Sequence, residues 1–175
     1  YTDGITVWDR NHNIMPNGTG LLGNSSSTQS GIIVPNPSDS NIFYIFTTDI
    51  IDIDTGATNG LNYSVLDLSL NGGFGDVTLQ KNIFLKSPVC EKLTAVKNET
   101  TNEYWVLSHG YGNNEFYSYR VTSTGVISTP VISTTGIVVD NNFPNFSIGY
   151  LKFSPDATKI ASVNMYLSLE LFDFD

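Results

Sequence analysis

Hydrophobic and polar positions alternate along most of the chain in short runs, which clusters of Gly, Pro, Asn, Asp and Ser separate. Alternation with a period of two is typical of β-strands, because successive side chains point to opposite faces of a sheet. The clearest unit is Tyr150–Val163, in which two such runs flank the turn sequence Ser154-Pro155-Asp156-Ala157. This unit predicts a strand, a tight turn and a second strand.

The unit recurs about every 53–62 residues, with looser copies at Gly31–Phe46 and Leu93–Leu107. Two further alternating runs follow each of these two copies, so the repeat contains four strands. A repeat of this length, built only of strands and turns, predicts the blades of a β-propeller.

The predicted third strands align on one residue each, at steps of 58, 53 and 53 residues: Asp9, Asp67, Arg120 and Asp173. The alignment divides the chain into four blade parts: 1–30, 31–89, 90–146 and 147–175. They hold two, four, four and three strands. The sequence therefore predicts an all-β fold, a single incomplete domain that is a partial β-propeller of about three and a quarter WD-repeat-like, four-stranded antiparallel blades. Because a closed propeller has at least four blades, we expect the remaining blades elsewhere in the same polypeptide.

Three finer assignments complete this prediction. They are a strand at Gly4–Asp9, a loop at His109–Asn114, and a connection to the last blade part at Gly136–Phe146.

Charge narrows the range of partners. The chain has 17 acidic and 8 basic residues, a formal net charge of −9, which argues against nucleic acid and anionic membrane surfaces. No apolar run approaches 18 residues, so we expect no membrane insertion. Polarity comes largely from Asn, Ser, Thr and Gly, as in many secreted β proteins.

The only cysteine is Cys90, so no disulfide can form within the chain. Its apolar neighbours Val89 and Leu93 indicate entry to a buried strand, and we expect Cys90 to be a core residue.

Three stretches together resemble a region of large secreted proteins of the Bacteroidetes: Tyr1–Met15, Gly60–Leu68 and Gly149–Ala161. In that family an N-terminal β-propeller precedes adhesion-type modules, and the chain often ends in the type B, gliding-motility-associated sorting domain of type IX secretion. The resemblance implies a location outside the cell or on the outer-membrane surface. It supplies no catalytic motif for this region.

The loop Thr48–Gly56 carries three carboxylates, Asp49, Asp52 and Asp54, which are candidate calcium ligands. Alternating oxygens followed by Gly56 match the start of a calcium loop, but no acidic residue stands where the bidentate Glu belongs. The alternative is a solvated loop in which three isoleucines pack inward: Ile50, Ile51 and Ile53.

A second candidate site lies in the predicted loop His109–Asn114, where His109, Tyr111 and Asn113 could face a ligand. His109 has no second histidine nearby with which to act in acid–base catalysis, because the only other histidine, His12, lies a blade or more away. Aromatic residues of the strands could form sugar-stacking platforms, although most should pack between blades: Trp8, Trp105, Tyr104, Tyr117 and Tyr119.

We therefore expect a non-catalytic binding or scaffolding module of a large cell-surface protein, without a cofactor, that recognises a protein or glycan ligand. One alternative is a fragment of a propeller-fold carbohydrate-active enzyme whose catalytic carboxylates lie partly in the missing blades. A third possibility is a structural spacer.

Overall fold

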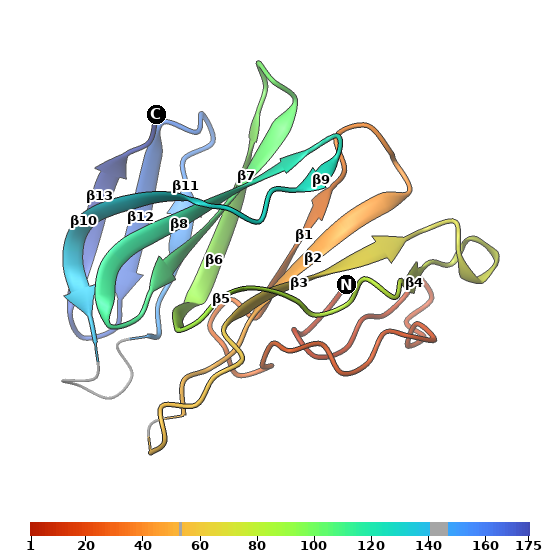
Figure 1. The fold of residues 1–175 in the computed structure, drawn as a ribbon, viewed down its shortest axis with the longest axis horizontal. Coiled ribbons are helices and arrows are strands. Elements are labelled where there is room, and N and C mark those ends of the chain that lie inside the picture. The colour runs from red at the N-terminus through yellow and green to blue at the C-terminus, as the bar shows by residue number, and fades with distance from the viewer. Residues whose placement is uncertain (53, 141–146) are drawn as a thin grey trace.

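A computed structural model describes residues 1–52, 54–140 and 147–175. Within these ranges the chain forms thirteen β-strands and one short 3-10 turn, η1 (Asn71–Gly73), and no α-helix. The strands make three separate antiparallel sheets (Figure 1). Ile53 and residues 141–146, the end of the predicted connection, lie outside the described residues.

Sheet 1 contains the first five strands in the order β1-β2-β3-β4, with β5 also paired to β3. Its strands are β1 (Gly31–Pro35), β2 (Ile42–Thr48), β3 (Leu61–Asp67), β4 (Asp76–Val77) and β5 (Ile83–Lys86). β-branched and aromatic residues dominate β2, which is almost wholly buried.

Sheets 2 and 3 repeat the same antiparallel path. Sheet 2 is formed by β6 (Val89–Asn98), β7 (Glu103–Gly110), β8 (Asn113–Thr122), β9 (Gly125–Val126) and β10 (Val131–Val139). Sheet 3 is formed by β11 (Leu151–Phe153), β12 (Lys159–Asn164) and β13 (Ser168–Asp173). The predicted anchors Asp67, Arg120 and Asp173 hold equivalent positions, opposite Ile42, Trp105 and Lys159 of the second strands.

The sheets stack face to face in chain order, and Figure 1 shows sheet 2 between the other two. Alternating side chains bury both faces of sheets 1 and 2. One apolar cluster joins sheets 1 and 2 and includes Phe46, Leu61, Val106 and Tyr119. A second joins sheets 2 and 3 and includes Leu107, Phe116, Leu151 and Ile160. A third cluster packs the N-terminal segment 1–30 on the remaining face of sheet 1 through Val7, Met15 and Leu21.

Gln29 connects the three sheets at the start of their first strands. Its side-chain oxygen accepts a hydrogen bond from the Leu151 amide at 2.9 Å, and its side-chain nitrogen donates to the Leu151 carbonyl at 3.3 Å. Its backbone amide donates to the Glu91 carbonyl at 3.0 Å. A single residue that precedes sheet 1 therefore forms hydrogen bonds to both sheet 2 and sheet 3.

The prediction of a strand at Gly4–Asp9 is wrong. This segment makes only the isolated bridges between Thr2 and Val7 and between Trp8 and Ile14. The Asp3 carboxylate accepts hydrogen bonds from the amides of Ile5 and Thr6, so a local turn satisfies backbone groups that a strand would have paired. Asp9 is likewise bound by the amides of Asn11 and Asn13 and is not a third-strand anchor.

Two boundaries in sheet 2 also differ from the prediction. β7 continues to Gly110 and β8 begins at Asn113, so the predicted loop shrinks to the turn residues Tyr111 and Gly112. Gly112 has φ +83°, a conformation that suits a two-residue hairpin turn. β10 continues to Val139 through an irregularity after Thr134, so residues 136–139 belong to the sheet. The all-β fold class is confirmed, whereas the described residues form no closed ring.

Candidate functional site

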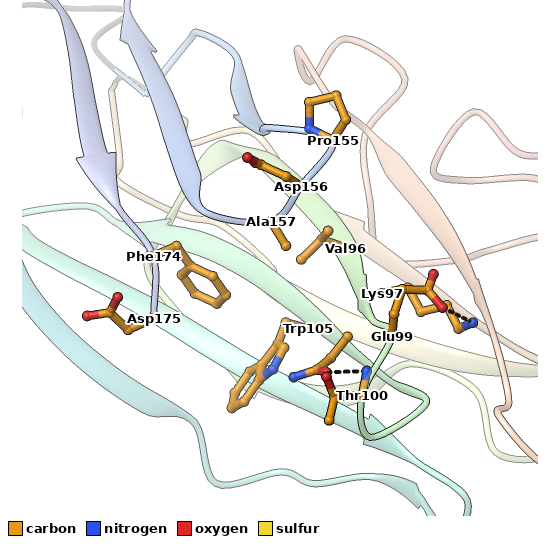
Figure 2. A pocket seen from close by; sticks show the side chains of 11 residues that line it. Val96, Lys97, Glu99, Thr100, Trp105, Pro155, Asp156, Ala157, Phe174 and Asp175 are labelled. Atoms are coloured by element: carbon orange, nitrogen blue, oxygen red, sulfur yellow. Dashed lines mark hydrogen bonds and ion pairs between the residues drawn. The ribbon is translucent and has the colours of Figure 1, made fainter.

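A cleft of about 500 Å³ opens between sheets 2 and 3, at the end of the stack that carries the β6–β7 and β11–β12 turns (Figure 2). It is lined by Val96, Lys97, Asn98, Glu99, Thr100, Trp105, Pro155, Asp156, Ala157, Phe174 and Asp175. The cleft combines aromatic surface with polar groups held by tight turns.

The aromatic part consists of Trp105 on β7 and Phe174, which follows β13. Their ring centroids are 6.3 Å apart and the rings are nearly perpendicular, at 80°. Phe153 supports Phe174 at 4.8 Å, and the Arg120 guanidinium lies 6.0 Å from the Trp105 ring. Figure 2 shows the Trp105 and Phe174 side chains in the space between the sheets, where Trp105 stays only half-buried.

Two turns fix the polar part. The Asp156 carboxylate accepts hydrogen bonds from the hydroxyls of Ser154 and Thr158. These bonds, with the Ser154 hydroxyl first, lower the pKa of Asp156 below its usual value and favour the ionised acceptor. In the facing turn, the Asn98 side-chain oxygen accepts from the amide of Thr100 at 3.0 Å. The Asp156 carboxylate and the Asn98 side-chain amide are therefore held in fixed orientations.

The Lys97 ammonium and the Glu99 carboxylate form an ion pair of 2.7 Å beside these groups. Because Glu99 is 79% exposed, water screens this pair strongly, and it contributes little stability. Its effect on the cleft is to neutralise one of the carboxylates at the rim.

The predicted binding residues His109, Tyr111 and Asn113 lie at the other end of β7, away from this cleft. His109 is a strand residue and not a loop residue, and only 1% of its surface is exposed. Its ring packs edge-on against Phe116 at 4.5 Å, and burial lowers the pKa of His109 to about 4. Tyr111 packs on buried Cys90, and Asn113 accepts a hydrogen bond from the Glu115 amide at 2.9 Å.

Cys90 is a core residue, as predicted. It has no exposed surface, and burial raises the pKa of its thiol to about 12. The thiolate, which is the reactive form, is therefore strongly disfavoured.

The calcium candidates do not converge on one point. Asp49 is buried and binds the Asn59 amide and side chain at 2.8 Å, while Asp52 lies at the exposed tip of the loop. The Asp52 carboxylate accepts bonds from the amide and hydroxyl of Thr55 and the amide of Asp54. Ile50 and Ile51 are half-buried. Among the described residues, no three His, Cys, Asp or Glu side chains are grouped to hold a metal ion.

The tyrosines largely pack between sheets, as predicted. Tyr117 and Tyr119 are buried between sheets 1 and 2, and Tyr104 packs against the same cluster. Trp8 stacks on Tyr1 at 5.1 Å near the N-terminus. Of the five aromatic residues proposed as platforms, Trp105 alone lines the cleft.

Sequence reasoning missed Lys92, a fully buried lysine on β6. Its ammonium reaches sheet 3 and donates to the Val163 carbonyl at 3.0 Å, to the Ser162 hydroxyl at 3.4 Å and to the Asn164 side chain. Burial lowers the pKa of Lys92, because removal from water disfavours the charged ammonium. Its signal in the sequence is a lysine inside an otherwise buried strand.

Comparison of the chain with protein-family models, with curated protein sequences and with solved structures found no match. Among the described residues, no helix has the length and apolar character needed to cross a membrane.

Proposed function

We propose that this chain is part of a β-propeller that acts as a non-catalytic binding module of a large extracellular or cell-surface protein. The stack of three antiparallel sheets in chain order supports the propeller architecture. The cleft beside Trp105 supports binding, and it is the observation that carries the proposal.

The ligand that fits this cleft best is a glycan. A half-buried tryptophan offers an apolar face on which a sugar ring stacks, and Asp156 offers an ionised acceptor for sugar hydroxyls. The acidic chain disfavours an anionic ligand. Because its hydrogen bonds keep Asp156 ionised, it is suited to accept hydrogen bonds and unsuited to act as a general acid.

The test is a glycan array probed with the chain, followed by calorimetry on the glycans retained. Trp105→Ala should weaken binding at least about tenfold, as expected for an aromatic anchor. Trp105→Phe keeps an aromatic ring and should retain part of the affinity. Trp8→Ala is the matched control, because Trp8 lies outside the cleft, and its affinity should equal that of the wild type.

Three results would contradict the proposal: no glycan retained, an affinity unchanged by Trp105→Ala in a chain that stays folded, or cleavage of the retained glycans. The last would favour the enzyme alternative.

A further inference from the structure

The face of sheet 3 that points away from sheet 2 is exposed, and it carries an apolar strip beside the charged residues Lys152, Lys159 and Asp173. On β13, Leu169 is 74% and Leu171 70% exposed, and Val163 of β12 lies directly opposite Leu169. Tyr150, just before β11, is 55% exposed. On the other face of the same strands, Phe172 packs on Phe116 of sheet 2 at 5.3 Å.

The strand register identifies what this face corresponds to in the preceding sheets. Val65, Ser118 and Leu171 follow one another at steps of 53 residues. The cross-strand pairs at these positions are Tyr44 with Val65, Leu107 with Ser118, and Ala161 with Leu171. The neighbouring pairs are Phe46 with Tyr63, His109 with Phe116, and Val163 with Leu169.

In sheets 1 and 2 these positions are covered by the next sheet along the chain. Tyr44, Phe46 and Val65 are buried in the cluster between sheets 1 and 2. Leu107 and Phe116 are buried in the cluster between sheets 2 and 3. The outer face of sheet 3 therefore continues an interface that the molecule already uses twice.

We infer that this face docks a fourth antiparallel β-sheet, supplied by the same polypeptide and packed in the same register. The inference rests on the proposed propeller architecture and is independent of the glycan cleft.

A second copy of these 175 residues cannot repeat the same contact. Each sheet-to-sheet contact joins the face just described to the opposite face of the following sheet. In a second copy those opposite faces are already covered, because the N-terminal segment 1–30 packs on sheet 1 through Val7 and Met15, and sheets 2 and 3 are packed on their predecessors.

Thiol labelling can test this inference. Leu171→Cys places a reactive thiol on the face, and Leu79→Cys, at a position 99% exposed between β4 and β5, is the matched control. Cys90 is buried and its thiol has a pKa of about 12, so it should not react with maleimide. Maleimide labelling rates are measured in the 175-residue chain and in the whole polypeptide that the gene encodes.

In the 175-residue chain both new thiols should react at similar rates. In the whole polypeptide Leu171→Cys should react at least about tenfold more slowly, while Leu79→Cys is unchanged. Equal rates in the whole polypeptide would overturn the inference. So would protection of Leu171→Cys in the 175-residue chain that increases with protein concentration, because a second copy would then cover the face. Glycan affinity is measured separately, so a failure of the glycan proposal can be distinguished from a failure of this inference.

Discussion

At the scale of single residues, the interior between sheets 2 and 3 is unusual in holding ionisable groups. Lys92 and His109 are both buried, and each has a lowered pKa because burial disfavours its charged form. The Lys92 ammonium finds three oxygen acceptors on β12, while the Nε2 atom of His109 has no hydrogen-bond partner. Protonation of His109 would place a second positive charge in this interior.

His109 should therefore make stability fall in acid. Its pKa is about 4 in the folded chain and about 6.5 when unfolded, so the unfolded state takes up the proton first. The resulting stability is present above pH 6.5 and is lost as the pH falls toward 4, by about 2–3 kcal/mol. Urea unfolding at pH 7 and pH 4 measures this loss.

The variant His109→Asn should show a smaller loss between these two pH values than the wild type, whatever its stability at pH 7. His12→Asn serves as the control, because His12 is exposed, and should keep the wild-type pH dependence. Identical pH dependence in all three proteins would disprove the role of His109.

At the scale of elements, hydrogen bonds between the first strands complement the apolar clusters between sheets. Gln29 precedes β1, yet both polar atoms of its side chain bind the backbone of Leu151 on β11. Its amide binds Glu91 on β6, and its carbonyl accepts a hydrogen bond from the Thr48 hydroxyl at 3.0 Å. Hydrogen bonds from the residue just before β1 thus connect the first strands of all three sheets.

The variant Gln29→Leu should lower the free energy of unfolding by about 1–3 kcal/mol, because the Leu151 amide and carbonyl would lose their partners. Gln80→Leu makes the same change at an exposed position and should have little effect. Urea unfolding measures the stability of the two variants. Equal stabilities would contradict the role of Gln29 in connecting the sheets.

The elements also differ in how well the sequence predicted them. β2 and β7, which are largely continuous apolar runs, and β12, which alternates, lie within the predicted copies Gly31–Phe46, Leu93–Leu107 and Tyr150–Val163 except for their last residues. The segment at Gly4–Asp9 has the same alternation but forms a turn, because Asp3 binds the local backbone. Alternation indicates which side chains are buried, and Val7 is buried, but it does not decide which groups pair with the backbone.

At the scale of the whole molecule, the two ends of the stack differ. Segment 1–30 closes the outer face of sheet 1 although it contains no named strand, and its contacts are made by Val7, Met15 and Leu21. The outer face of sheet 3 carries exposed leucines. Burial of apolar area on sheet 1 should therefore depend on this segment.

The variant Val7→Asp should destabilise the chain by more than about 3 kcal/mol, because it places a carboxylate at a position in the cluster that has no exposed surface. Ile14→Asp introduces the same group in the same segment at a position 54% exposed and should have little effect. Thermal unfolding and binding of a hydrophobic dye would report the exposed face of sheet 1. Similar stability of the two variants would show that segment 1–30 does not cover the sheet.

Apolar runs, local alternation and turn residues were enough to predict most strands of the three sheets and the repeat register at Asp67, Arg120 and Asp173, but they gave a false strand at Gly4–Asp9 and too short a β10. The apolar neighbours of Cys90 were also enough to predict that it is buried. The candidate sites depend on tertiary packing: His109 lies in the interior and not in a loop, and Trp105, Asp156 and Phe174 from two different sheets line one cleft. Such convergence depends on how sheets stack across long sequence separations, and no local pattern encodes it.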